Sequence, residues 1–484
     1  MSEASRIRLN SVFSFLSISI RLISNIFVFL LIARYYGAEN FGRFTFAHSL
    51  AAIFILFADF GFDVLLTTEI ARDRKNAISN FQIYFSFKII FCLIALVSMW
   101  IIALSTSLDP ESRVLILIFS FYVIFTALTN FLFALFKGFE LLQYETKISF
   151  IINVTLLVVI IVLKLYNISI NFIALFFVFS RILGLIFSVR ASSKILPGIN
   201  YHPKFTRWRE VRSKVMVFGV HLLFSNLFFQ LDTLLIAFIR GEYEVGIYQA
   251  VFKLVLLPLI IPDVIINALL PVLSRTFSEN PERWEKLGRI MNKLLILVSL
   301  PVTMILFVYA KPIIEIVYNA KEFLPAIPVL RIFALILFVR FTVETYALML
   351  TTSNRQHKRM LVVVIATLLN FGINLYMISN FGFLGAAYTS LLTNVLVGIG
   401  YIFYTYPLIR NWLINIKIFS LIGFVLVVSI ILWNYTIETF WYSAPLAFLT
   451  VSIILYFTGL TKSEREQILA EQKILSRLST KRFL

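Results

Sequence analysis

The sequence is dominated by apolar runs that are about as long as a membrane is thick. Runs of about 20 apolar residues, the length that crosses a bilayer as an α-helix, recur along nearly the whole chain. The chain is 60% hydrophobic and 14% charged, whereas soluble domains are usually about 45–50% apolar and about 25% charged. The runs are continuous rather than alternating, which excludes a membrane β-barrel. The predicted fold class is therefore an all-α polytopic membrane protein.

Charged breaks between the apolar runs predict fourteen transmembrane helices. They span 10–34, 44–66, 83–106, 114–136, 149–166, 169–189, 215–239, 244–270, 291–310, 327–350, 361–379, 383–406, 418–434 and 441–459. Most of the 43 Lys and Arg residues lie in the termini and in alternate loops. Because these residues concentrate in the cytoplasm, both termini are predicted to be cytoplasmic. The same asymmetry accounts for the net charge of +18 without a nucleic acid partner.

The sequence argues against an enzyme. The loops predicted on the outer side are short, the longest being 311–326, and leave no room for a catalytic domain. The single cysteine, Cys92, and four scattered histidines have no metal-ligand spacing. No G-x-x-x-x-G-K-[ST] motif is present, so ATP hydrolysis by this chain is not expected. We therefore expect no catalytic residues, no metal site and no cofactor.

One segment of the chain returns half a chain later. LLIARYYGAENFGRF (30–44) and LLIAFIRGEYEVGIY (234–248) share six of fifteen positions, including two glycines, at an offset of 204 residues. The same offset aligns Asp59 with Asp263, which favours a shared structural role for these two residues. Parallel repeats of this kind are one common plan of secondary transporters. The glycines are expected in tight turns on the outer side, where they relieve steric limits on φ.

The repeat divides the chain into two bundles of six helices around a central cavity, followed by two extra helices. We predict an N-terminal lobe (1–190), a basic cytoplasmic linker (191–214), a C-terminal lobe (215–406), transmembrane helices 13 and 14 (407–460) and a cytoplasmic tail (461–484).

Several motifs in this repeat and after it resemble one transporter family. ARYYGAENFGRFTFAHSL (33–50) and ADFGFDVLLTTEIARDR (58–74) resemble the opening of Wzx-type O-antigen and polysaccharide repeat-unit flippases. These flippases belong to the multidrug/oligosaccharidyl-lipid/polysaccharide (MOP) superfamily. Three later segments resemble later signatures of the family in the expected order: QLDTLLIAFIRGEYEVGIYQAVFKL, LLPVLSR and FGFLGAAYTSLLTN. The resemblance covers essentially the whole chain.

The resemblance implies a function as well as a fold. An oligosaccharide on undecaprenyl pyrophosphate, such as an O-antigen repeat unit, would be moved from the inner to the outer leaflet of the bacterial cytoplasmic membrane by alternating access. The implied partners are this undecaprenyl-pyrophosphate-linked glycan and membrane lipids, with a polysaccharide polymerase and a chain-length regulator as further candidates. The coupling ion, or a role for the membrane potential, is left open.

Two other functions compete with this interpretation. A MATE-like drug/cation antiporter of the same superfamily usually has twelve helices and a cavity dominated by carboxylates. A membrane polysaccharide polymerase, ligase or glycosyltransferase generally needs a large extramembrane loop. Fourteen predicted spans, arginines near mid-membrane and short loops favour the flippase.

Ionisable residues inside predicted spans are the candidate functional residues, because each costs about 2.5–3.5 kcal/mol at a helix centre. Four cations are expected to form a cationic cavity for the pyrophosphate: Arg21, Arg181, Lys253 and Arg340. Arg suits this task because its planar fork binds phosphate oxygens bidentately. The alternative is that each cation neutralises a buried carboxylate. Five carboxylates are candidates for ion coupling or charge pairing: Asp59, Asp63, Asp232, Asp263 and Glu344.

Spacing indicates two local pairs among these charges. Asp59 and Asp63 share a helix face near Arg72 and Arg74, which favours a structural pairing, with ion coupling as the alternative. Arg340 and Glu344 are also four residues apart, as in a helical salt bridge. We further expect Lys88 to extend to the cytoplasmic surface.

Overall fold

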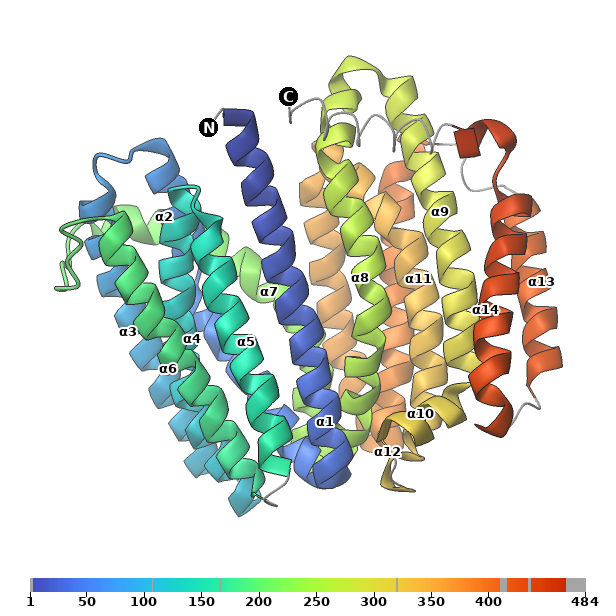
Figure 1. Ribbon diagram of the computed structural model, residues 1–484, viewed down its shortest axis with the longest axis horizontal. Helices are drawn as coiled ribbons and strands as arrows, with labels where there is room; N and C mark the ends of the chain where they lie inside the picture. Colours follow the sequence, from blue (N-terminus) through green and yellow to red (C-terminus); the bar gives the residue numbers. More distant parts are fainter. Residues whose placement is uncertain are drawn as a thin grey trace. The chain divides into compact units, whose positions relative to one another are not determined.

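The computed structural model describes residues 3–106, 108–164, 168–318, 321–409, 416–433 and 437–466, and this part of the chain contains helices and short connections without a strand (Figure 1). It forms two compact units, an N-terminal unit (Met1–Gln249) and a C-terminal unit (Ala250–Leu484). The division falls within the helix Glu242–Glu279. The helix before it, Trp208–Arg240, packs on helices of the N-terminal unit. The repeated segment at 234–248 therefore belongs to the N-terminal unit. The lobe boundary at 191–214 stays a prediction.

Seven complete helices and the start of an eighth build the N-terminal unit. They are α1 (Glu3–Asp59), α2 (Phe62–Arg72), α3 (Ala77–Ser105), α4 (Pro110–Gly138), α5 (Leu142–Lys164), α6 (Ile170–Ile195), α7 (Trp208–Arg240) and α8 (Glu242–Glu279). Helix α4 begins where the sequence favours it, because Asp109 accepts a hydrogen bond from the Glu111 backbone N–H and Pro110 occupies the first helical turn. The predicted helix at 44–66 ends early, because the chain takes positive φ at Phe60 and Gly61 and restarts as α2.

The first glycine of each repeated segment breaks the chain in the same way. Gly37 interrupts α1 with φ 76° and ψ 177°, and Gly241 separates α7 from α8 with φ 92° and ψ −179°. This backbone conformation is open to glycine and strongly unfavourable for other residues. The expected tight turns are therefore present at both positions.

The second glycine of each segment lies within a helix and not in the expected turn, at a place where two helices cross. A Cβ atom on Gly42 would lie 1.7 Å from the Glu242 carbonyl oxygen, and one on Gly246 would lie 1.9 Å from the Ala38 carbonyl oxygen. Ala38 and Glu242 occupy equivalent positions of the repeat, so the two segments pack on each other through equivalent residues. Only glycine allows this approach of backbone to backbone.

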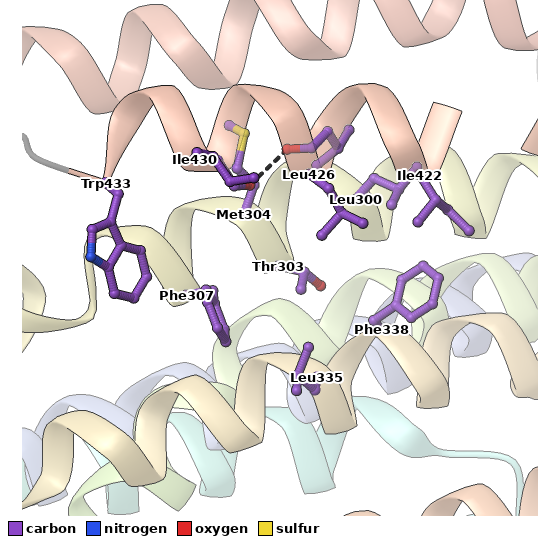
Figure 2. Close-up of a pocket in the computed structure, with 12 residues that line it drawn as sticks. Leu300, Thr303, Met304, Phe307, Leu335, Phe338, Ile422, Leu426, Ile430 and Trp433 are labelled. Atoms are coloured by element: carbon purple, nitrogen blue, oxygen red, sulfur yellow. Dashed lines mark hydrogen bonds between the residues drawn. The ribbon is translucent and has the colours of Figure 1, made fainter. Parts of the chain in front are cut away.

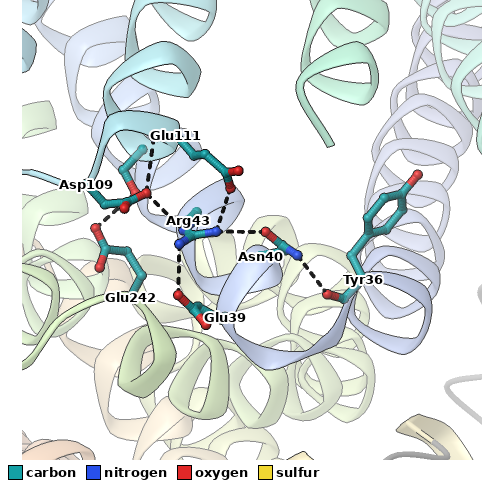
Figure 3. A network of polar contacts seen from close by, with 8 residues as sticks. Tyr36, Glu39, Asn40, Arg43, Asp109, Glu111 and Glu242 are labelled. Atoms are coloured by element: carbon teal, nitrogen blue, oxygen red, sulfur yellow. Dashed lines mark hydrogen bonds and ion pairs between the residues drawn. The ribbon is translucent and has the colours of Figure 1, made fainter. Parts of the chain in front are cut away.

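Arg43 joins α1 to α4 beside this crossing (Figure 3). Its guanidinium pairs with Asp109 at 3.2 Å, with Glu111 at 2.5 Å and with Glu39 at 2.8 Å. In the same first turn of α4, the Ser112 hydroxyl donates a hydrogen bond of 2.9 Å to Glu242. Carboxylates thus neutralise this arginine.

Edge-to-face aromatic contacts fill the core where α1, α4 and α6 meet. Phe29, Phe44 and His48 of α1 pack with Phe119 of α4 and Phe177 of α6. The ring centroids of Phe29 and His48 are 4.9 Å apart, and those of Phe44 and Phe119 are 5.1 Å apart. Such pairs each add about 0.5–1.5 kcal/mol beyond the apolar area they bury.

The rest of α8 and six further helices, with two short 3₁₀ turns, build the C-terminal unit. They are α9 (Pro281–Val308), α10 (Ala310–Tyr318), η1 (Lys321–Phe323), α11 (Ala326–Thr352), α12 (Gln356–Thr405), η2 (Tyr406–Leu408), α13 (Ile416–Leu432) and α14 (Ile437–Gly459). Helix α12 contains the two predicted helices 361–379 and 383–406, separated by non-helical backbone at Gly382. The predicted outer loop 311–326 holds α10 and η1.

Helices α13 and α14, which follow the repeat, pack on α9 (Figure 1). Their buried interface includes Leu300 and Met304 of α9, Leu421 of α13 and Val451 of α14. The Tyr309 hydroxyl donates a hydrogen bond of 3.1 Å to Ser443, so the only polar group of this tyrosine side chain is satisfied inside the apolar cluster.

The described residues contain nine helices that are long and apolar enough to cross a membrane. Two of them, in α1 and α12, include the glycine breaks described above. The protein is thus an all-helical membrane protein, and the count of fourteen spans stays a prediction. The predicted tail at 461–484 is described only as far as residue 466.

Candidate functional site

An ion triplet with a buried lysine connects α1, α2 and α3. The Lys88 ammonium lies 2.8 Å from Asp59 Oδ1 and 2.7 Å from Asp63 Oδ1, and Asp59 also accepts a hydrogen bond from the Asp63 backbone N–H. The expectation that Lys88 extends to the cytoplasmic surface is wrong, because this side chain is fully buried. Two carboxylates compensate its charge, which removes the need to reach water. The sequence had placed Arg72 and Arg74 near the aspartates, but the cation in contact with them is Lys88.

Asp263, the repeat equivalent of Asp59, has different surroundings. It is exposed on α8 and interacts electrostatically with Arg340. The structural role of Asp59 is therefore not repeated at Asp263.

A charged pocket of about 380 Å³ opens beside this triplet in the N-terminal unit. Four ionisable residues line it, Arg21 of α1, Asp63 of α2, Lys137 of α4 and Glu145 of α5, together with threonine, asparagine and apolar side chains. Glu145 lies 3.7 Å from Arg21 and 3.4 Å from Lys137. The side chains of Arg21 and Lys137 are 39% and 45% exposed. Two cations are thus accessible from one pocket.

Arg181 of α6 adds positive charge near this pocket. It interacts electrostatically with Arg21. Its guanidinium donates a hydrogen bond of 3.0 Å to the Tyr122 hydroxyl and lies 5.1 Å from the centre of that ring. The two N-terminal members of the predicted cationic group are therefore neighbours.

Charged side chains gather at a second place, in the C-terminal unit. Arg340 and Glu344 lie one turn apart on α11, and both interact electrostatically with Asp263 of α8. Arg359 and Tyr401, both on α12, interact with Glu344. The sequence identified the first three residues but not the two on α12, because Arg359 lies in a predicted cytoplasmic loop and Tyr401 is one of 20 tyrosines.

Asp232 and Lys253 lie in separate surroundings. Asp232 is buried and accepts a hydrogen bond of 2.5 Å from the Tyr248 hydroxyl. The Lys253 ammonium lies 6.0 Å from the ring centre of Phe252. The binding and coupling roles of all the named ionisable residues stay predictions.

An apolar groove of about 650 Å³ lies among α9, α11 and α13 (Figure 2). Its walls are mostly aliphatic and aromatic side chains, including Phe307, Phe338 and Leu426. Trp433 lines one end, and the Arg331 guanidinium lies 4.4 Å from the centre of its ring. Sequence patterns did not reveal this groove, because lipid-facing and groove-lining positions have the same apolar composition.

Glu145 was also missed by the sequence analysis. It lies between the predicted helices that end at 136 and start at 149, so the sequence predicts a loop at this position. In the structure it lies in the first turn of α5, and its side chain is buried. Only the packing of α1 and α4 around it reveals its position between two cations.

Comparisons with known proteins place this fold among transporters. The sequence matches a family model described as polysaccharide biosynthesis protein over residues 8–277 and a model described as MatE over residues 218–376. A comparison with curated protein sequences gives no match.

Three solved structures are similar over most of the chain. The lipid II flippase MurJ in an inward closed conformation has a TM-score of 0.74 at 17% identity, covering 94% of this chain and 99% of its own. An inward-facing multidrug resistance MATE family transporter of the MOP superfamily has a TM-score of 0.65 at 14% identity, covering 81% and 98%. A MOP superfamily transporter from Pyrococcus furiosus has a TM-score of 0.55 at 14% identity, covering 84% and 96%. At these identities the likeness shows the fold alone, which is MurJ/MATE-like.

Proposed function

Because the chain belongs to the polysaccharide biosynthesis protein family and is a transporter of the MOP superfamily, we propose that it flips an undecaprenyl-pyrophosphate-linked oligosaccharide. The substrate is an O-antigen or similar polysaccharide repeat unit, moved from the inner to the outer leaflet of the bacterial cytoplasmic membrane by alternating access. Both termini face the cytoplasm in this proposal. The observation that carries it is the pocket of the N-terminal unit, where Arg21 and Lys137 are accessible inside a helical membrane protein.

The charge around this pocket suits a pyrophosphate. Arg21, Lys137 and Arg181 contribute three positive charges, and the described contacts of Arg181 are with Tyr122, an uncharged partner. A cation inside a membrane is costly, and it usually marks a substrate or ion pathway. Arginine stays ionised there and offers a planar fork to phosphate oxygens. We therefore assign the pyrophosphate to this group of residues.

In the C-terminal unit, Lys253 and Arg340 remain proposed contacts for an anionic substrate. Arg340 interacts with two carboxylates, Glu344 and Asp263, whereas Arg21 shares one carboxylate, Glu145, with Lys137. We accordingly expect a smaller contribution to binding from Arg340 than from Arg21.

The apolar groove suits the lipid part of such a substrate. Its wall from Leu300 to Trp433 offers apolar surface along α9 and α13, and each methylene buried there contributes about 0.8 kcal/mol. A hydrocarbon chain of polyprenyl type fits a groove with few polar groups better than a sugar does. We propose that part of the undecaprenyl chain occupies it.

A second candidate function is a MATE-like drug/cation antiporter. The MatE match over residues 218–376 favours it, and the half-buried carboxylates Asp59 and Asp63 are the type of group that binds a cation. Both carboxylates, however, are already paired with Lys88. The flippase explains the accessible arginine and lysine, which would repel a cationic drug.

Mass spectrometry of undecaprenyl-linked lipids, in cells with and without this protein, tests the proposal. We expect the complete lipid-linked repeat unit to accumulate without the protein, and surface polysaccharide to be lost. Unchanged lipid intermediates together with altered resistance to cationic drugs would instead support the antiporter.

Single-residue variants test whether the charged pocket is needed for this transport. Arg21→Ala should fail to restore surface polysaccharide at wild-type expression. Arg275→Ala removes an exposed arginine that pairs with Glu279 on the same helix, so this matched control should restore it. Equal restoration by both variants would remove Arg21 from the proposed site.

A further inference from the structure

Glu145 holds an unusual position in the charged pocket. Only 3% of this residue is exposed, and its Oε2 atom is buried without a hydrogen-bond partner among the described residues. The neighbouring cations are Arg21, 3.7 Å from Oε1, and Lys137, 3.4 Å from Oε2. A buried carboxylate oxygen without a hydrogen bond is expensive, so this position needs an explanation.

The two ion pairs of Glu145 are loose. Charge-assisted hydrogen bonds between a cation and a carboxylate are usually about 2.7–2.9 Å long, and both distances here are longer. Arg21 and Lys137 therefore keep donors that are not used by Glu145, and both side chains are accessible from the pocket. An incoming anion can reach these donors without unfolding the helices.

The other carboxylate of the pocket does not compete for these cations. Asp63 lines the same cavity, but its Oδ1 atom is held 2.7 Å from Lys88. Among the described residues that line the pocket, Glu145 is thus the carboxylate paired with Arg21 and Lys137.

We propose that Arg21 and Lys137 form a phosphate-binding site in which Glu145 is the resident anion. Without substrate, the Glu145 carboxylate occupies the position between the two cations. A phosphate or pyrophosphate group displaces it and takes over the unused donors. Glu145 thereby sets the affinity of the site and allows release, because the carboxylate returns as the phosphate leaves. The identification of this anion as the pyrophosphate of a lipid-linked substrate rests on the proposed function.

Binding of inorganic pyrophosphate to the full-length protein in zwitterionic nanodiscs tests the proposal by calorimetry. Glu145→Gln keeps the shape of the side chain and removes its charge. It should bind pyrophosphate about tenfold more tightly, the size expected for one charge-assisted hydrogen bond. Lys137→Gln should bind it about tenfold more weakly by the same reasoning.

A matched control and a second variant protect the test against misfolding. Glu279→Gln removes an exposed carboxylate that also pairs with an arginine, and it should bind pyrophosphate like the wild type. Glu145→Asp keeps the charge and should remain closer to the wild type than Glu145→Gln. Wild-type or weaker binding by a monodisperse Glu145→Gln protein would overturn the resident-anion role.

Lipid analogues separate this proposal from the proposed function. Geranylgeranyl pyrophosphate should show the same Glu145→Gln effect as inorganic pyrophosphate, whereas geranylgeraniol, which lacks phosphate, should show none. If both pyrophosphates respond to Glu145→Gln but lipid intermediates do not accumulate in cells without the protein, the anion site stands and the flippase proposal fails. If lipid intermediates accumulate but Glu145→Gln leaves pyrophosphate binding unchanged, the flippase proposal stands and the resident-anion role fails.

Discussion

Substitution of Gly42 by alanine tests the packing of the repeated segments on each other. The added Cβ atom would lie 1.7 Å from the Glu242 carbonyl oxygen and 2.9 Å from the Gly246 nitrogen. To reach an ordinary contact of about 3.4 Å, the two backbones would have to separate by about 1.7 Å. Overpacking by a methyl group costs about 1–3 kcal/mol where side chains can adjust. Since both partners here are backbone, we expect about 3 kcal/mol, more than a hundredfold in the unfolding equilibrium.

Thermal unfolding of the purified protein, followed by intrinsic fluorescence, measures this cost. At a conservative 2 °C per kcal/mol, Gly42→Ala should unfold about 6 °C lower than the wild type. Gly372→Ala is the matched control, because nothing lies within 4 Å of its added Cβ atom in α12. This control should be neutral or slightly stabilising, since alanine is the better helix former. Equal unfolding temperatures for the two variants would refute the close crossing at Gly42.

Three further predictions concern charged groups outside this crossing. Lys88→Met should destabilise the protein by about 3 kcal/mol, the low end for a broken buried pair, because two half-buried carboxylates lose their fully buried cation; a thermal midpoint equal to that of the wild type would contradict the triplet. Trp433→Ala should cost about 0.5–2 kcal/mol through loss of the contact with Arg331, and Trp433→Phe should cost less; equal costs would argue against a cation–π contact. Burial raises the pKa of Glu464, but hydrogen bonds from Lys293 and from a backbone N–H outweigh it, so its pKa lies below the ordinary value. The stability from this depressed pKa is present above the unfolded pKa of about 4.3 and is lost as the pH falls through the lower folded value. Hydrogen exchange of residues 460–466, corrected for its intrinsic pH dependence, should therefore become faster on acidification of the wild type. The Glu464→Gln variant should not show this increase.

The sequence predicted the helices well where apolar runs have clear ends. The predicted helix 327–350 corresponds to α11, which spans Ala326–Thr352. The two agree because the whole apolar run forms one helix that is buried along its length. The repeated glycines also predicted the breaks at Gly37 and Gly241 correctly. The prediction was wrong at Phe60 and Gly61, where the chain takes positive φ and breaks between α1 and α2, because the apolar run continues on both sides of Asp59 and Asp63 and therefore predicts one helix.

The candidate site was less accessible from the sequence. Spacing predicted that Asp59 and Asp63 share a face of one helix, but they belong to α1 and α2, and their common partner Lys88 comes from α3. The positions of Lys137 and Glu145 beside Arg21 depend on the packing of α1, α4 and α5. Such contacts join residues from different helices, and a single sequence contains no pattern that records them.

Transbilayer movement of a fluorescent lipid-linked sugar in proteoliposomes tests the central claim most directly. The substrate is a polyprenyl-pyrophosphoryl sugar with a reducible fluorophore on the sugar, and dithionite added outside quenches the molecules of the outer leaflet. If the protein is a flippase, wild-type vesicles should lose fluorescence well beyond the outer-leaflet fraction, and Arg21→Ala vesicles should stop near it. A wild-type signal that stops at the same level as protein-free vesicles would contradict the flippase.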